Sequence, residues 1–157
     1  MGSLFHARGC SERCENVVGM LCLEMVGYFV DEKDSQQVPP AIPKWLRWLF
    51  PNRGNFLAAV GNPRSWKLCW RFRRGFKKVT RFPLFSIVLP ERIPEIHLSD
   101  HRAFWLFGFP ALMLTDTSFL RNPNYHQWSD TADTLDYDRM AEVTLGVANA
   151  VRSLARG

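Results

Sequence analysis

Residues 122–136 read N-P-N-Y-H-Q-W-S-D-T-A-D-T-L-D and place His126 in a loop rich in proline and asparagine. Hydroxyl and carboxylate side chains follow it closely, namely Ser129, Asp130, Thr131 and Asp133. A metal-binding imidazole needs a partner for its second ring nitrogen and a loop that a rigid element fixes. The stretch is therefore compatible with a metal ligand at His126. The alternative is a polar loop that precedes a helix and leaves this histidine exposed.

Three further blocks stand before this stretch. They read V-G-M-L-C-L-E-M-V-G (residues 18–27), S-D-H-R-A-F-W (99–105) and G-F-P-A-L-M-L-T-D-T (108–117). Together with Y-H-Q-W-S-D-T-A-D-T-L-D, and in this order, they resemble the zinc-dependent aminopeptidases, family twenty-eight of the metallopeptidases. The resemblance covers nearly the whole chain. It implies that His126 is a zinc ligand.

Apolar runs at residues 17–26, 56–60, 85–89 and 111–115 predict strands, the first of them buried on both faces. Helices are expected at 3–14, 66–78, 100–107 and 137–155. The alternation predicts an α/β fold with a mostly parallel mixed sheet flanked by helices. The resemblance implies an incomplete zinc-aminopeptidase fold of the phosphorylase/hydrolase-like type.

Hydroxyl and carboxylate residues stand where three of the helices should begin. Ser65, Ser99 with Asp100, and Asp136 are predicted N-caps, because their oxygens accept bonds from free backbone N–H groups. In the last helix, apolar residues recur every three or four positions and predict one buried stripe. The stripe comprises Met140, Val143, Val147, Val151 and Leu154.

Glu24 interrupts the first apolar run near its carboxyl end, where ligands bind in open α/β sheets. A lone buried carboxylate costs several kcal/mol unless it is paired or bound to a metal. A salt bridge to an arginine and a metal site are both open on these grounds. The resemblance implies that Glu24 is a ligand of one zinc ion and that His126 serves the other.

Two further acids are candidates for ordering the surroundings of the zinc ions. The resemblance implies this role for Asp100, and we assign it to Asp130 as well. Some relatives carry a tyrosine shortly before the S-D-H block that helps to polarise the substrate carbonyl. Residues 93–98 contain His97 but no tyrosine, and whether His97 replaces it is open.

The family takes further ligands from an H-x-D block and its general base from adjacent glutamates, and the chain contains neither pattern. We therefore expect residues 1–157 to form a single partial domain, the carboxyl-terminal part of a peptidase that binds two zinc ions and a peptide substrate. An amino-terminal segment of the same domain is an expected partner. The alternative is a non-catalytic remnant or binding module of the same fold.

Two segments outside these blocks stand out. The loop at residues 28–55 is long and proline-rich, and the resemblance implies that it is an insertion that shapes the substrate cleft. Residues 64–81 carry eight lysines and arginines and no acid. They form either a basic surface that binds a membrane or nucleic acid, or a helix whose Trp66, Cys69, Trp70 and Phe76 cover the sheet. We favour the second interpretation, because a helix after a buried strand must cover that sheet.

Composition is that of a globular protein, with 46% hydrophobic and 22% charged residues among 157. Four cysteines without a C-x-x-C pair are expected to be reduced thiols. No secretory signal is recognisable, and no apolar run is long enough to span a bilayer. We expect no membrane span and no nucleic-acid partner, and a cytoplasmic location by default.

Overall fold

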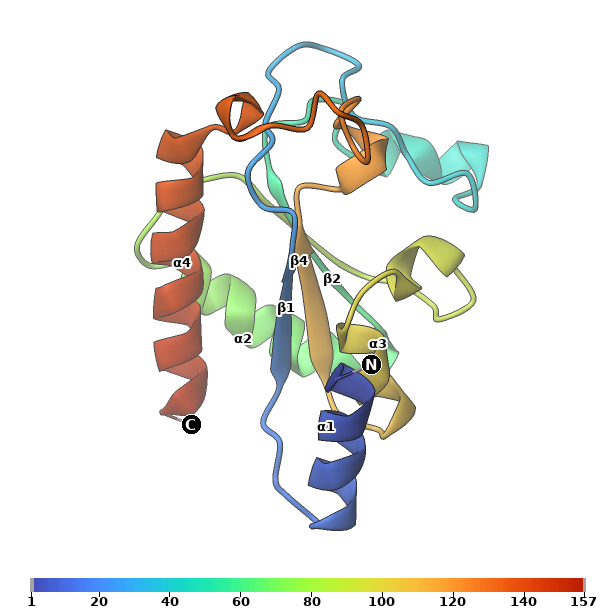
Figure 1. Ribbon diagram of the computed structural model, residues 1–157, viewed down its shortest axis with the longest axis vertical. Helices are drawn as coiled ribbons and strands as arrows, with labels where there is room; N and C mark the ends of the chain where they lie inside the picture. The colour runs from blue at the N-terminus through green and yellow to red at the C-terminus, as the bar shows by residue number, and fades with distance from the viewer. Residues whose placement is uncertain (1, 157) are drawn as a thin grey trace.

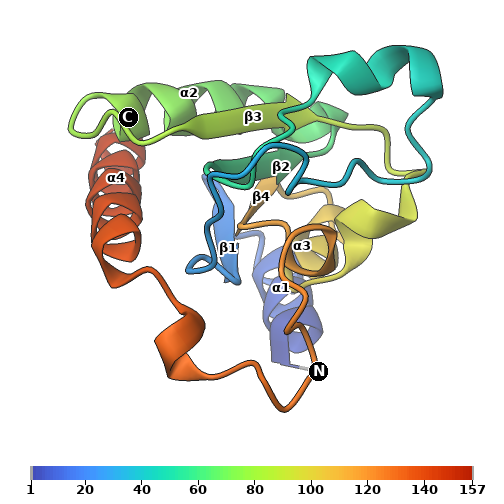
Figure 2. The ribbon, with the colours of Figure 1, turned by 90° about the horizontal axis from the view of Figure 1, so that it is seen from above.

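The computed structural model describes residues 2–156. Its sheet has four strands: β1 (Met20–Glu24), β2 (Leu57–Gly61), β3 (Leu84–Val88) and β4 (Ala111–Thr115). They lie in the order β1-β4-β2-β3. The pairs β1–β4 and β2–β3 are parallel, whereas β4 and β2 run antiparallel between them. Strands β1, β4 and β2 are labelled in Figure 1, and β3 is labelled beside α2 in Figure 2. The predicted fold class, a mostly parallel mixed sheet flanked by helices, is confirmed.

Helices cover both faces of this sheet. They are α1 (Gly2–Glu12), α2 (Trp66–Lys77), α3 (His101–Leu106) and α4 (Tyr137–Ala155). Figure 2 shows α2 and α4 on one face and α1 and α3 on the other. Side chains of β2 alternate accordingly: Leu57 and Ala59 join the core under α2 and α4, while Ala58 and Val60 join the core under α1 and α3.

The first strand is shorter and less buried than its apolar sequence predicts. Within the described chain β1 pairs with β4 alone, so its other edge carries no partner strand. Leu23 is consequently 53% exposed, and only Cys22 of this strand is fully buried. The prediction of burial on both faces is therefore wrong for residues 17–26. Strand β2, which lies between two neighbours, is buried throughout.

Two of the predicted helix caps do not form, because their side chains bind elsewhere. Asn62, not Ser65, caps the turn before α2: its Oδ1 accepts bonds from the backbone N–H and the hydroxyl of Ser65. The Ser65 hydroxyl in turn accepts a bond from Ala111 N–H at the start of β4. Neither Ser99 nor Asp100 caps α3. The predicted cap at Asp136 is confirmed by its bond from Arg139 N–H at 3.0 Å.

Helix α2 turns a different set of side chains to the sheet from the set predicted. Leu68, Cys69, Phe72 and Phe76 are buried. Trp66 and Trp70 are 57% and 54% exposed, so the prediction that they cover the sheet is wrong. Leucine and phenylalanine at every third or fourth position already fill that face, which leaves the indoles on the outer one.

In α4 the buried stripe contains Val143, Val147 and Leu154, as predicted. Val151 is exposed, and Ala150 is buried in its stead. A small residue is needed there because α2 approaches closely. A Cβ built on Gly75 of α2 would lie 2.7 Å from Cα of Ala150.

All four cysteines carry free thiols, as predicted from their spacing. Among residues 2–156, no helix is both long enough and apolar enough to cross a membrane.

Candidate active site

The carboxyl ends of the parallel strands β1 and β4 lie side by side, with Glu24 paired in register to Thr115. Both strands are followed by residues with positive φ angles: Met25 at 52°, and Thr117 at 74°. Non-glycine residues rarely adopt this conformation, and such strain gathers at functional sites. The two sharp turns direct the chain away from the sheet at the edge where α/β proteins bind ligands.

Asp116 holds these two turns together. Its side chain is buried and accepts bonds from the N–H groups of Gly27 (3.2 Å) and Tyr28 (2.9 Å) after β1, and of Ser118 (3.0 Å) after β4. Its own N–H donates to the carbonyl of Met25 at 2.6 Å. Burial raises the pKa of Asp116, while the three backbone donors and Arg121 act in the opposite direction. A short acidic side chain thus fixes the position of both strand ends.

A second buried charge, Arg121, fixes the loop at residues 28–55. Its guanidinium donates to Tyr28 O (3.2 Å), Phe56 O (3.0 Å) and Gln36 Oε1 (3.0 Å). It also lies 4.6 Å above the ring of Phe56. Burial lowers the pKa of Arg121 to about 10, so the group keeps its charge at neutral pH. The first residue of the loop, Gln36 within it and the residue that follows it are therefore bound to one side chain.

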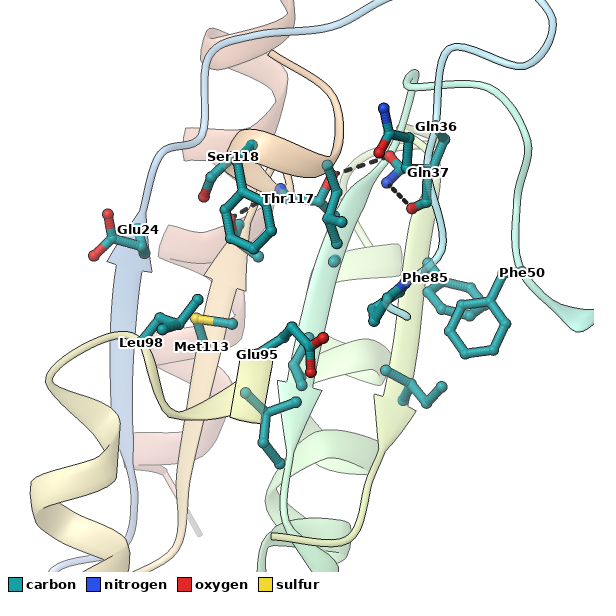
Figure 3. Close-up of a pocket in the computed structure, with 18 of the residues that line it drawn as sticks. Glu24, Gln36, Gln37, Phe50, Phe85, Glu95, Leu98, Met113, Thr117 and Ser118 are labelled. Atoms are coloured by element: carbon teal, nitrogen blue, oxygen red, sulfur yellow. Dashed lines mark hydrogen bonds between the residues drawn. The ribbon is translucent and has the colours of Figure 1, made fainter. Parts of the chain in front are cut away.

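Beside these turns, on the face that carries α1 and α3, lies a cavity of about 110 Å³. Its lining is mainly apolar, and all four strands contribute to it, with Phe50, Phe85 and Met113 among the larger side chains (Figure 3). Strand β1 contributes Glu24 at one margin. The loop at 28–55 contributes Gln36, Gln37, Pro39, Phe50 and Pro51. Such a cavity suits an apolar side chain.

Glu95 is a second carboxylate of the lining and lies between Met113 and Phe85 (Figure 3). Its Oε2 is buried and has no hydrogen-bond partner among residues 2–156. A buried acceptor without a partner is costly. A ligand group that donates a hydrogen bond would fit beside it.

Glu24 is held in place by a hydroxyl and not by a cation. Ser99 Oγ donates to Glu24 Oε2 at 2.6 Å, and Cys22 Sγ lies 3.1 Å from the same hydroxyl. The ion pairs found within residues 2–156 involve Arg13 and Arg139, so none of them neutralises Glu24. The salt bridge that the sequence left open is thus not formed within the described chain.

His126 lies in an exposed turn with a φ angle of 58°. Its ring stacks on that of Tyr125, with centroids 3.9 Å apart and planes at 17°. Tyr125 lines the cavity that Glu24 also lines, whereas His126 itself does not contact it. The structure thus brings the His126 loop and the end of β1 to the same cavity, through Tyr125.

The other candidate residues lie away from the cavity lining. Asp100 is exposed and accepts a bond from Ser3 Oγ at 2.8 Å, which ties α1 to the start of α3. Asp130 is exposed and closes the turn that contains His126, with Asn122 Nδ2 at 3.4 Å from its Oδ1. His97 donates through Nε2 to the carbonyl of Glu91 and packs edge-on against Trp105.

A zinc site takes three or four nitrogen, sulfur or carboxylate ligands. Nowhere in the described part of the chain do three or more histidine, cysteine, aspartate or glutamate side chains gather in a way that could hold a metal ion. Residues 2–156 alone therefore do not fit a zinc centre.

Sequence reasoning missed the two residues that organise this edge. Asp116 had a signal, because an acid directly after a buried strand and before a threonine is unusual in a core. Arg121 had no such signal, because it stands in a polar loop of a chain with many arginines. Its three acceptors lie in segments that are distant in sequence.

The chain is similar to known proteins in sequence and in fold. A sequence model of peptidase family M28 matches residues 1–151. An uncharacterized protein of Escherichia coli (strain K12), YfbL, is 38% identical over 148 residues, which are 94% of this chain and 44% of that protein.

Two solved structures share the fold. The LapA aminopeptidase of Legionella pneumophila superposes with a TM-score of 0.61 at 19% identity, over 95% of this chain and 34% of its own. An aminopeptidase from Aneurinibacillus sp. strain AM-1 gives a TM-score of 0.59 at 20% identity, over 96% of this chain and 29% of its own. The chain thus spans less than half the length of each of these relatives.

Proposed function

Since the chain belongs to peptidase family M28, we propose that it forms the carboxyl-terminal part of an aminopeptidase-type catalytic domain. Members of this family are zinc-dependent, and bound zinc would supply activated water for hydrolysis of the amino-terminal peptide bond. The complete domain would hold two zinc ions and a peptide substrate. This chain would contribute part of the metal ligands and part of the substrate cavity.

One observation carries the proposal: the carboxylate of Glu24, which forms no ion pair within residues 2–156, lies at the margin of an apolar cavity. Its position at the carboxyl end of β1 is the position at which this fold class binds ligands. Ser99 holds one carboxylate oxygen by a 2.6 Å bond and thereby orients the side chain. A ligand that is oriented by a neighbouring hydrogen bond is typical of metal sites.

The remaining roles follow from position. Glu24 and His126 would each serve one of the two zinc ions. Asp130 would stabilise the turn that carries His126, and Asp100 would fix α3 beside Ser99. The cavity would bind the apolar side chain of the substrate's first residue, and the loop at 28–55 would form part of its wall.

The zinc ligands that residues 2–156 lack would then come from another segment. We assign them to an amino-terminal segment that carries the H-x-D and Glu-Glu patterns. Without that segment, the lack of a three-donor cluster favours a second candidate function, a non-catalytic module with the same fold.

Activity of the isolated chain and of a complemented form tests both. The 157-residue chain alone should not hydrolyse an aminoacyl anilide above background. Co-expression with an amino-terminal segment that carries the missing patterns should give hydrolysis that a chelator abolishes. Glu24→Ala and His126→Ala should fold with that segment but lose activity by orders of magnitude.

Matched controls are available on the surface. Glu32→Ala and His6→Ala remove an exposed acid and an exposed histidine outside the cavity lining, and should leave activity unchanged. Robust chelator-sensitive hydrolysis by the chain alone would contradict the assignment of the missing donors. Full activity of the Glu24→Ala form would contradict its role as a ligand.

A further inference from the structure

The outer face of α2 combines aromatic and basic side chains and no acid. The core-facing side is formed by Leu68, Cys69, Phe72, Gly75 and Phe76, all buried. Every other residue of this helix except the half-buried Arg71 is exposed. The basic–aromatic face, as we name it, consists of Trp66, Lys67, Trp70, Arg73, Arg74 and Lys77.

Positive charge is concentrated on this segment and is not neutralised there. Residues 64–81 carry eight lysines and arginines and no aspartate or glutamate, which exceeds the +5 net charge of the whole chain. The remainder of the chain is therefore net negative. The ion pairs within residues 2–156 are formed by Arg13 and Arg139, so none involves a cation of α2. The positive charge of this face would attract an anionic partner.

The two indoles of this face lie one helical turn apart and each pairs with a cation. Lys67 Nζ lies 5.6 Å from the Trp66 ring centroid, and Arg74 Cζ lies 4.6 Å from that of Trp70. Tryptophan rings concentrate at the interface between lipid headgroups and acyl chains, where a lysine or arginine can reach the phosphates. Each basic residue near an anionic leaflet adds to the electrostatic attraction.

Geometry favours a bilayer over a nucleic acid. Proteins that bind single strands combine a basic groove with free aromatic faces on which bases stack. The outer side of a single helix is convex, and one face of each indole is already covered by its cation. A bilayer surface, in contrast, accepts a helix that lies flat with its tryptophans in the interface.

Helix α2 is packed firmly against the rest of the protein, so the basic–aromatic face is already ordered before it binds a partner. Phe72 and Phe76 are fully buried, and α2 packs along α4. Lys77 Nζ donates to Phe82 O at 2.6 Å, which holds the end of the helix to the following loop. Little conformational entropy would be lost on binding.

We propose that the basic–aromatic face of α2 docks the protein on membranes that contain anionic phospholipid. Trp66 and Trp70 enter the headgroup region, and Lys67 and Arg74 contact lipid phosphates. The contact is peripheral, because only exposed side chains of one helix take part.

Vesicle flotation tests the proposal, since bound protein rises with the lipid whereas aggregated protein sediments. The full chain should float with vesicles of phosphatidylcholine that contain about one third phosphatidylglycerol, and not with phosphatidylcholine alone. Added salt should release it. The Trp66→Ser/Trp70→Ser and Lys67→Glu/Arg74→Glu variants should each bind at least about tenfold less.

Control variants change the same chemistry elsewhere. Trp128→Ser removes a fully exposed indole, and Arg92→Glu/Arg102→Glu reverses two exposed charges outside α2. Both should float like the wild type, with circular dichroism confirming that every variant is folded. Equal loss in control and α2 variants, or equal binding to neutral vesicles, would overturn the proposal. So would tight, salt-sensitive binding of a labelled single-stranded oligonucleotide in the absence of vesicle binding.

Discussion

The hydroxyl of Ser99 donates a 2.6 Å hydrogen bond to the carboxylate of Glu24, across 75 positions of sequence. The bond joins the segment before α3 to the end of β1. It explains why an acid is tolerated at the end of an apolar strand without a basic partner, because a charged acceptor gains more from a hydrogen bond than a neutral one.

If that bond orients a metal ligand, its loss should weaken metal binding more than folding. Ser99→Ala, in the chain complemented by its amino-terminal segment, should lower zinc affinity by about 10- to 100-fold. Competition with a chelator measures this. Thr144→Ala removes a comparable hydroxyl bond, to Met140 O on α4 and outside the candidate site, and should leave affinity unchanged. Equal zinc affinity in both variants would argue against a positioning role for Ser99.

Arg121→Met should destabilise the fold strongly. The change leaves the carbonyls of Tyr28 and Phe56 without their donor and Asp116 without its nearest buried cation. We expect the free energy of unfolding in urea to fall by about 3–5 kcal/mol. Arg92→Met, at an exposed site, should stay within about 0.5 kcal/mol of the wild type. If Arg121→Met does not fold, Arg121→Lys should still show a reduced midpoint.

The contact between α2 and α4 leaves no room at Gly75. In Gly75→Ala the new methyl would meet the backbone of Ala150 at 2.7 Å, so the two helices must move apart. We expect a loss of about 1–3 kcal/mol, measured by urea unfolding, despite the better helix propensity of alanine. Gly9→Ala meets only the flexible side chain of Arg13 and should be neutral or stabilising by up to about 1 kcal/mol.

Stability should decrease on acidification because of His101. This ring is buried, donates through Nε2 to Ile96 O at 2.6 Å, and has its pKa lowered from 6.5, mainly by burial. Below about pH 6.5 the unfolded chain binds a proton that the folded chain does not, so the free energy of unfolding decreases as the pH is lowered. His101→Gln should reduce that slope. Urea unfolding of the wild type and of His101→Gln, repeated at several pH values around 6.5, gives the difference in slope. Asp116, whose raised pKa acts in the opposite direction, contributes equally to both proteins and cancels.

The open edge of β1 should cause the isolated chain to self-associate. Within residues 2–156, the outer edge of this strand has no partner strand, so its N–H and C=O groups are unpaired there and lie beside Leu23, which is 53% exposed. Leu23→Lys should shift the chain towards the monomer in sedimentation analysis. Leu145→Lys, on α4 and equally exposed, should not. A wild-type chain that is monomeric at all concentrations would contradict this prediction.

The sequence was sufficient for elements whose signal is local. Apolar runs located all four strands to within a few residues, and the period of α4 with its cap at Asp136 located that helix. The orientation of Trp66 and Trp70 could not be predicted, because α2 has large apolar side chains on both sides. Whether an indole or a phenylalanine faces the sheet depends on the space left by α4.

The candidate site was only partly accessible to the same reasoning. Glu24 was found because an acid in an apolar run is conspicuous. The partners that fix the site are separated by 65 to 93 positions, as in the bonds from Arg121 to Phe56 O and Tyr28 O. No local pattern records such pairings, so Ser99 and Arg121 were not recognised as the residues that hold Glu24 and the loop.

The four-stranded sheet separates the cavity from the basic–aromatic face, since the cavity lies on the side of α1 and α3 and α2 lies on the other. A protein attached to a lipid surface through α2 would therefore open its cavity towards the aqueous phase. Peptides in solution would reach it freely, whereas chain ends held close to the bilayer would be shielded by the thickness of the protein. If the cavity binds peptides as proposed, attachment would select substrates by their distance from the membrane as well as by their first residue.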